Sequence, residues 1–229
     1  MNTRTAVRAD LTRDAIVDRA LSIADVEGSD AITIRRLAHE FDVTPMALYW
    51  HVKNKDELLA AMGDRFYQEL APLGNSGPWS DRLRAVMSAL VQSLRNHPGS
   101  AHLAAHRVLA NEAGQELTEA TLAMLRDAGF SVIQASDIAR SALQSAVMLV
   151  TQMAGAEVAL AADERDAAMR AKRDMITTLP AERFPNLIAC VDALTDCEDE
   201  DGYYDFGVDL FLAGVERLNA ATKRQNRQA

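Results

Sequence analysis

Aromatic and basic side chains crowd one short stretch of this 229-residue chain. Tyr49, Trp50 and His51 are consecutive. Lys53 and Lys55 follow them within four residues. Because a helix turns about 100° per residue, three consecutive rings cannot all face a core. Rings and ammonium groups held in solvent can contact base edges and phosphates, which is the chemistry of nucleic-acid recognition. The disfavoured alternative is a plain helical hairpin with these rings in its core.

The pattern before these residues predicts the elements that hold them in place. Ile34, Leu37 and Phe41 recur with the spacing of one helical face, and Asp42 interrupts the pattern. A second helix, over residues 44–52, is expected to begin at a capping threonine followed by a proline in the first helical position. Two short helices joined by a tight turn can place the second in the major groove of DNA, which is about 12 Å wide.

Residues at the outward positions and caps of these helices are the candidates for DNA contact. Asn54 is expected to cap the next helix, with Glu57 in capping-box position, and the amides at such caps can meet phosphates. The residues that we expect to contact DNA are Thr33, Arg35, Arg36, Thr44, Pro45, Met46, Tyr49, Trp50, His51, Lys53 and Lys55.

A known family carries similar residues in the same order. In the TetR family of one-component transcriptional repressors, the reading helix ends in a segment that resembles LYWHVKNKDELL (48–59), after a helix and turn similar to TIRRLAHEFDV (33–43). The last helix of the tetracycline-repressor branch is similar to YDFGVDLFLAGVER (204–217), so the resemblance spans residues 11–222. It implies a ligand-responsive repressor, not an enzyme, that binds a palindromic operator as a homodimer and is released by a small-molecule effector.

The reading head departs from the tetracycline repressor at several positions, two of which touch bases in that protein. Pro45 and Met46 replace polar or cyclic residues, and Ile34 replaces a hydroxyl residue. The resemblance therefore implies a different operator. The partner is double-stranded DNA, and the two heads of a symmetric dimer would lie about 34 to 36 Å apart or a little more.

Composition favours an all-α fold with two parts. Leu, Ala, Arg, Glu and Met dominate, β-branched runs are short, and 48% hydrophobic residues suffice for a sizeable core. A boundary is expected at PLGNSGPW (72–79), which concentrates turn-forming residues. We expect a helix-turn-helix DNA-binding head over residues 1–71 and a larger helical effector-binding and dimerisation domain over residues 79–229.

The charge balance is the main objection to a DNA partner. The chain has a net charge of −9, and residues 1–71 carry nine Lys and Arg against twelve Asp and Glu. Since nucleic acid attracts basic surfaces, the cations of the head must lie on one face and its carboxylates elsewhere. The rest of the chain, with fifteen against twenty-one, would repel DNA from everything except the head.

Apolar periodicity and breakers predict the helices outside the helix-turn-helix. Thr12 is expected to cap the first of them and Gly28 to end it. The loop before the last helix, with Pro180, Pro185 and an acidic run at 197–201, is expected to be a solvated connection. The helices of the second domain are expected over residues 79–96, 99–111, 114–128, 131–160, 163–178 and 203–222.

Two of these helices, 131–160 and 203–222, are more apolar than a monomer requires. Periodicity alone favours an intrachain core. The resemblance implies instead a dimer formed by a bundle of the penultimate and last long helices of each chain, and glycines seven residues apart would let another helix approach closely. The expected dimer residues are Phe206, Gly207, Leu210, Phe211, Gly214 and Leu218.

Histidines mark the candidate ligand site. His102 and His106 are four residues apart, just after His97, a spacing that can hold a metal or contact a ligand on one helical face. No Cys or carboxylate completes a metal set, so we predict neither a metal nor a cofactor, and partly exposed or hydrogen-bonded histidines remain the alternative. The resemblance matches His102 to a drug-contacting histidine, but Ala71 stands where a second one is found, so tetracycline itself is not expected. The expected ligand-binding residues are His102, His106, Thr121, Leu125, Val147, Met148 and Gln152.

Two other functions stay open from the residues alone. A metal-dependent enzyme would use the three histidines with Glu112, although no ligand motif or poised base supports it. A helical binding module without an effector is the other. No export signal or convincing membrane span is found, which predicts a cytoplasmic protein with two reduced cysteines. The identity of the effector, the operator sequence and the regulated genes do not follow from the sequence.

Overall fold

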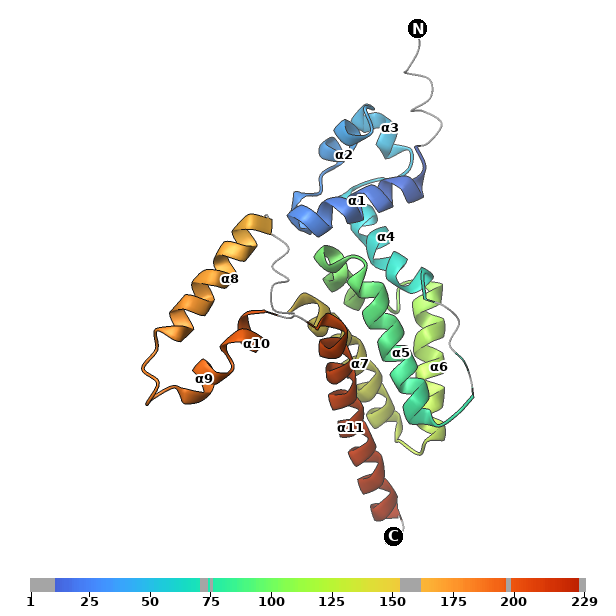
Figure 1. Cartoon of the computed structure of the whole chain (residues 1–229). Helices are drawn as coiled ribbons and strands as arrows, with labels where there is room; N and C mark the ends of the chain where they lie inside the picture. Colours follow the sequence, from blue (N-terminus) through green and yellow to red (C-terminus); the bar gives the residue numbers. More distant parts are fainter. Residues whose placement is uncertain (1–10, 71–73, 75, 153–161, 197–198, 227–229) are drawn as a thin grey trace.

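The computed structural model describes residues 11–70, 74, 76–152, 162–196 and 199–226. Within these ranges the chain is helical and contains no strand, which confirms the all-α prediction. Figure 1 shows a small group of helices near the N-terminus, a longer bundle below it and a separate group to one side. The expected boundary segment 72–79 falls partly outside the described residues, as do Arg4 and Arg8.

The head contains α1 (Arg13–Glu27), the short 3-10 helix η2 (Ser29–Ala31), α2 (Ile34–Glu40) and α3 (Pro45–Tyr49). α1 begins and ends as predicted, because the Thr12 hydroxyl accepts a hydrogen bond from the N–H of Ala15 and Gly28 ends the helix at φ 80°. Thr33 caps α2 in the same way, at 3.1 Å from the N–H of Arg36. The predicted side-chain cap at Thr44 is wrong, since α3 begins at Pro45 without one. These fixed ends make the head a rigid unit of short helices.

Helix α4 (Lys55–Gln68) runs from the head into the body (Figure 1). Asn54 caps it through a 2.8 Å hydrogen bond from the N–H of Glu57. The Glu57 carboxylate accepts from the N–H of Lys53 rather than from Asn54 itself, so the expected capping box is shifted by one residue. Leu58, Met62 and Phe66 are fully or almost fully buried. A single helix therefore packs in both parts of the molecule.

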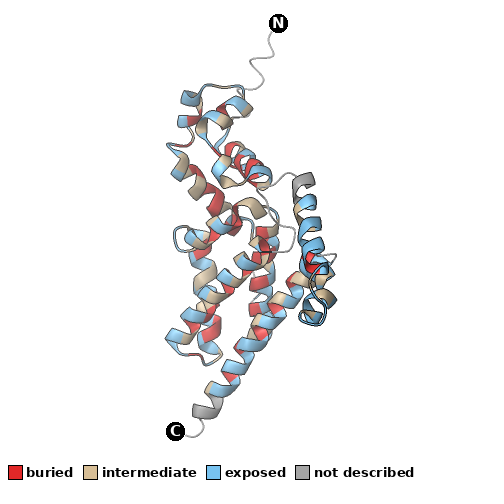
Figure 2. Cartoon of the chain, turned by 90° about the vertical axis from the view of Figure 1, so that its left-hand side faces the viewer, coloured by how far each residue is buried: buried red, intermediate tan, exposed pale blue. Residues whose placement is uncertain are grey.

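The body is a bundle of α5 (Trp79–Arg95), the 3-10 helix η3 (Pro98–His106), α6 (Glu112–Asp127), α7 (Val132–Thr151) and α11 (Glu200–Asn226). Helices α7 and α11 pack on α5, and η3 packs on α4 and α7. Buried residues line the helix faces that meet inside this bundle (Figure 2).

Helices α7 and α11 run antiparallel. Gln134 near the start of α7 lies 3.2 Å from the hydroxyl of Thr222 near the end of α11, and Leu149 near the end of α7 lies against Gly207 near the start of α11. The amide of Asn219 also donates to the carbonyl of Ala128, just before α7, at 3.0 Å. The predicted helix over 131–160 is described only to Thr151, because residues 153–161 lie outside the described residues.

A third group of helices stands away from the bundle (Figure 1). It consists of α8 (Ala162–Thr177), α9 (Pro185–Ala189) and α10 (Val191–Thr195), which pack mainly on one another, and we call it the arm. Part of the loop that was expected before the last helix forms α9 and α10, which the sequence did not predict, although most of their residues are exposed as expected for a solvated connection. Cys190, in the arm, is a free and exposed thiol, and Cys197 lies outside the described residues.

Candidate nucleic-acid interface and ligand cavity

Helix α3 holds its aromatic side chains out in solvent. Trp50 is 85% exposed, Met46 67% and Tyr49 46%. Leu48 and Val52 are completely buried and attach the helix to the head. Only a narrow aliphatic edge of α3 is therefore buried in the head. The opposite surface, with aromatic rings, a thioether and a proline, is free for contact with a partner.

Cations flank this surface unequally. Lys53 is exposed, whereas Lys55 is half-buried and its ammonium lies 3.5 Å from the carbonyl oxygen of Asp30. Arg35 and Thr44 are exposed on the same part of the head, and His51 is half-buried. Lys53 is thus the more accessible of the two lysines for a phosphate.

Arg36 is occupied within the head. Its guanidinium donates to Glu40 at 2.8 Å and to Glu27 at 2.9 Å, and Arg19 also pairs with Glu40. Hydrogen bonds from Arg19 and then Arg36 lower the pKa of Glu40 to about 2. These contacts join α1 to α2, so the guanidinium of Arg36 is paired with carboxylates of the head in this structure.

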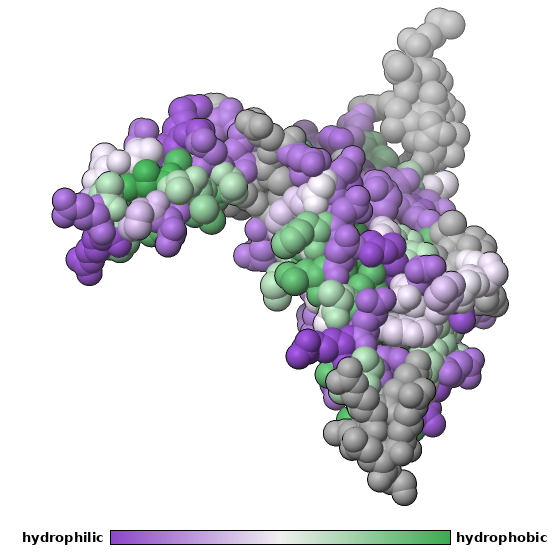
Figure 3. Space-filling view, turned by 60° about the horizontal axis from the view of Figure 1, so that its bottom comes forward, coloured by the Kyte–Doolittle hydropathy of each residue, from purple (hydrophilic) through white to green (hydrophobic). Residues whose placement is uncertain are grey.

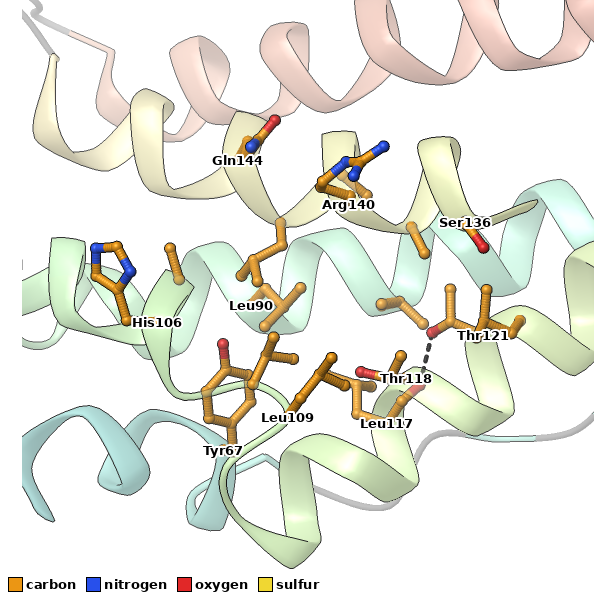
Figure 4. Close-up of a pocket in the computed structure, with 17 residues that line it drawn as sticks. Tyr67, Leu90, His106, Leu109, Leu117, Thr118, Thr121, Ser136, Arg140 and Gln144 are labelled. Atoms are coloured by element: carbon orange, nitrogen blue, oxygen red, sulfur yellow. Dashed lines mark hydrogen bonds between the residues drawn. The ribbon is translucent and has the colours of Figure 1, made fainter. Parts of the chain in front are cut away.

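The body contains a cavity of about 500 Å³ (Figure 4). Helices α4, α5, α6 and α7 and the segment around the end of η3 all contribute to its wall. Leucine, valine and alanine side chains form most of it, and Tyr67 of α4 closes one end. A cavity of this size with an apolar wall and a few polar groups is typical of a small-molecule site. The polar residues that line the cavity are Tyr67, His106, Thr118, Thr121, Ser136, Arg140 and Gln144.

The sequence located part of this cavity. Of the seven expected ligand-binding residues, only His106 and Thr121 line it. Leu125 is completely buried in the core, and Val147, Met148 and Gln152, near the end of α7, do not line the cavity. The residues of the prediction that do not line the cavity are His102, Leu125, Val147, Met148 and Gln152.

His102 is elsewhere because the predicted α-helix over 99–111 is wrong. Residues Pro98–His106 form a 3-10 helix, with three residues per turn, so positions 102 and 106 face about 120° apart instead of sharing a face. The ring of His102 lies 3.4 Å from the Ser29 hydroxyl in the head, and partial burial lowers the pKa of His102. His102 therefore lies at the contact between the head and the body.

Residues that sequence reasoning missed lie on α7. Ser136, Arg140 and Gln144 are spaced by four and form a polar row along one wall of the cavity (Figure 4). The available signal was this polar stripe on an otherwise apolar helix, although the stripe alone does not distinguish a cavity wall from a solvated face.

Polar contacts at three places, Tyr67 and Asp64 of α4 and Asp25 of α1, connect these helices to the segment that contributes to the cavity wall. The buried Tyr67 hydroxyl donates to the carbonyl of Ala104 at 2.7 Å, and burial raises the pKa of Tyr67. Arg107 forms a two-pronged pair with Asp64, at 2.9 and 3.1 Å. The amide of Asn111 also donates to Asp64, at 3.0 Å. The end of η3 is therefore tied to the same helix that begins at the DNA-reading unit.

The third contact is a carboxylate–imidazole pair. Asp25 of α1 lies 2.7 Å from Nδ1 of His97 and accepts from the N–H of Gly99 at 3.2 Å. The hydrogen bond to Asp25 raises the pKa of His97. Gly99 permits this approach, because a Cβ there would lie 2.0 Å from the carbonyl oxygen of Ala24.

The residues expected at a dimer interface separate into two groups. Phe206, Leu210 and Leu218 of α11 are 68%, 65% and 53% exposed. A Cβ on Gly207 would lie 2.3 Å from Leu149, so Gly207 serves packing within the chain rather than the expected approach of a second one. Phe211 is half-buried against the core, and Gly214 faces open space.

The described residues offer neither a metal site nor a membrane-spanning helix. No group of three or more His, Cys, Asp or Glu side chains in the described ranges is placed to hold a metal ion. No helix in that part of the chain is long and apolar enough to cross a membrane.

Comparison with known proteins relates both parts of the chain to one family. Residues 16–62 match the family "Bacterial regulatory proteins, tetR family", and residues 71–218 match "Tetracyclin repressor-like, C-terminal domain". An HTH-type transcriptional regulator of Saccharopolyspora erythraea is 36% identical over 121 residues, which cover 52% of this chain and 51% of that protein. The chain thus spans about half the length of that relative. The class C tetracycline repressor protein of Escherichia coli is 28% identical over 93% of this chain and 94% of its own.

Solved structures show the same architecture. A possible TetR family transcriptional regulator from Streptomyces coelicolor A3(2) has a TM-score of 0.73 at 26% identity, covering 90% of this chain and 99% of that one. ActR of Streptomyces coelicolor, solved in complex with actinorhodin, has a TM-score of 0.69 at 28% identity, covering 91% and 98%.

Proposed function

Since the chain belongs to the TetR family of transcriptional regulators, we propose that it is a repressor that binds a palindromic operator as a homodimer and leaves it when a small molecule binds. The head, residues 1–71, reads the DNA, and residues 79–229 bind the effector and the second subunit. The observation that carries this proposal is α3, whose buried side anchors it while Trp50, Met46 and Tyr49 extend into solvent.

Contact with DNA would use the exposed face of α3 for base edges and the residues around it for phosphates. The ring-bearing side chains suit apolar and hydrogen-bonding contacts in the major groove. Lys53, Arg35 and the amides at the capped starts of α2 and α4 suit phosphates. The net charge of −9 disfavours DNA over the rest of the surface, which supports binding through the head alone.

Exposed apolar residues on two neighbouring helices support the homodimer. Phe206 and Leu210 of α11 have large exposed fractions, and so does Met148 of α7, at 62%. Gly207 and Leu149 are in contact, so these stretches of α7 and α11 adjoin. Hydrophobic side chains also gather on the body and along the arm in Figure 3. Apolar surface of this extent is typical of a protein–protein interface.

The cavity and its link to α4 support control by an effector. The complex of ActR with actinorhodin makes a small-molecule ligand the natural expectation here. A ligand that fills the cavity would press on Tyr67 and on the segment that Arg107 ties to Asp64. Movement of α4 would then shift α3 relative to the second head, and a coupling of about 1–3 kcal/mol changes operator affinity about 5- to 150-fold.

Selection from a random DNA library tests the proposal directly. The purified protein is expected to enrich an inverted repeat whose half-sites lie about one helical turn apart. A protein carrying Trp50→Ala is the control and is expected to enrich the same inverted repeat more weakly over the same number of rounds. Enrichment of an asymmetric site, or of no site by the unaltered protein, would refute the proposed mode of binding.

A further inference from the structure

The charge on the wall of the cavity restricts the kind of molecule that it accepts. Seventeen residues of the part of the chain that the structure describes line the cavity, and of these Arg140 alone has a permanent charge and none carries a carboxylate. Among the same described residues, His106 is the only other side chain that can become cationic. The cavity therefore presents positive charge and hydrogen-bond donors on an apolar background, without any group to balance a cation.

Arg140 is placed to exchange its present partner for a ligand. It pairs with Asp137 one turn earlier on α7, where the two side chains are 66% and 57% exposed. An exposed pair of this kind contributes little to stability, so a ligand can replace it at small cost. Asp137 is not part of the cavity wall. Arg140 therefore lines the cavity while its present partner lies outside the wall.

The neighbours of Arg140 favour recognition of an acidic oxygen group. A guanidinium presents a planar fork of N–H donors that matches a carboxylate. Gln144 follows one turn later on the same face and Ser136 precedes it by one turn, so further donors lie on either side (Figure 4). Away from α7, Leu90, Leu109 and Leu117 supply apolar contact for the body of a ligand.

We infer that the effector is a mainly apolar organic anion of drug-like size, whose acidic oxygens pair with Arg140 while its body fills the space between α5 and α6. This inference rests on the proposed function, in that it takes the cavity to be the effector site. A cationic molecule would meet Arg140 without a compensating carboxylate, and a hydrated metal complex would find His106 as the only metal-binding side chain of the usual types in the wall.

A pair of fluorescent probes separates charge from apolar burial. The probes are 1-anilinonaphthalene-8-sulfonate, an anion, and N-phenyl-1-naphthylamine, its neutral counterpart, both of which brighten on transfer to an apolar site. Titrations at about 0.15 M salt limit binding to exposed cations elsewhere. The unaltered protein is expected to bind the anion at least severalfold more tightly than the neutral probe.

Substitution of Arg140 is the decisive step. Arg140→Gln is expected to weaken binding of the anion about tenfold and to change binding of the neutral probe by less than twofold. Arg140→Lys, which keeps the positive charge, is expected to retain most of the affinity for the anion that Arg140→Gln loses. Arg19→Gln removes a similarly exposed, carboxylate-paired arginine from the head and is expected to affect neither probe. Leu90→Trp fills the cavity and is expected to abolish binding of both, with circular dichroism showing that the variant remains folded.

Other results would overturn the inference. These are equal effects of Arg140→Gln on both probes, no effect on either, a preference for the neutral probe, absence of binding by both, or full binding to a folded Leu90→Trp variant. Operator binding is measured separately on the same samples. Loss of the anion preference with intact operator binding would reject the inference alone, whereas an intact preference without sequence-specific DNA binding would reject the proposed function.

Discussion

Replacing Trp50 by alanine should separate DNA binding from folding, because the two depend on opposite faces of α3. Trp50 is 85% exposed, so only a small part of its surface is buried in the free protein. With about 200 Å² for a tryptophan side chain, the buried remainder is roughly 30 Å². At about 25 cal/mol per Å², its loss costs less than about 1 kcal/mol of unfolding free energy.

The expected loss in operator affinity is larger than this. A side chain that contacts base edges contributes about 1–3 kcal/mol of binding free energy, which corresponds to an increase in Kd of about 5- to 150-fold. The adjacent Leu48 provides the matched control, since it is completely buried. Leu48→Ala is expected to lower the unfolding free energy by about 2–5 kcal/mol and to affect DNA binding only through the loss of folded head.

Two assays on the same preparations measure these effects. Fluorescence anisotropy with a labelled operator gives Kd, and urea denaturation followed by circular dichroism gives the unfolding free energy. The reasoning would be refuted if Trp50→Ala destabilised the protein as much as Leu48→Ala. It would also be refuted if Trp50→Ala left the operator Kd unchanged.

Three further perturbations test other parts of the structure. Lys53→Ala is expected to reduce the slope of log Kd against log salt by about one phosphate contact, and an unchanged slope in anisotropy titrations would remove Lys53 from the interface. His97→Gln tests the link between α1 and η3. Asp25 raises the pKa of His97 in the folded chain above the usual value of about 6.5. The pair therefore stabilises the folded protein fully below about pH 6.5, and its contribution is lost as the pH rises through the raised pKa. The difference in unfolding free energy between the unaltered protein and His97→Gln should therefore be largest below about pH 6.5 and shrink as the pH rises through the raised pKa, and a difference that grew would contradict the pairing. Leu210→Glu places a charge on an exposed apolar position of α11 and is expected to convert dimers to monomers in sedimentation velocity without loss of helicity, whereas an unchanged dimer would exclude this face.

The starts of α1, α2 and α4 could be predicted because local chemistry determines them. Thr12, Thr33 and Asn54 each accept a hydrogen bond from the amide three residues later, which is the geometry their side chains favour wherever a helix begins. The outward position of Trp50 followed from the number of consecutive rings, since a helix has only one buried face. Thr44 is the exception, because Pro45 alone suffices to start α3.

Elements that depend on distant packing could not be predicted in the same way. Residues Pro98–His106 have the composition of an α-helix but form a 3-10 helix packed against α4 and α7, and this change moves His102 to the head. Helices α9 and α10 have five residues each, which is too short for helical periodicity to show.

The cavity is the least predictable feature. Its wall combines residues from α4, α5, α6 and α7, so no single segment of the sequence shows it. Arg140 and Gln144 have the pattern of a solvated helix face, and only the positions of the other helices place them beside an apolar space. The core therefore follows from composition, whereas the site follows from how the helices meet.

Methylation interference on the selected operator tests the central claim most directly. Dimethyl sulfate methylates guanine N7 in the major groove and adenine N3 in the minor groove, so it reports which groove α3 enters. Bound and free DNA are separated and cleaved at the modified bases. We predict that binding is blocked by methylated guanine N7 in two symmetric clusters about one helical turn apart. Interference confined to adenine N3, or to a single cluster, would contradict a dimer that reads the major groove through α3.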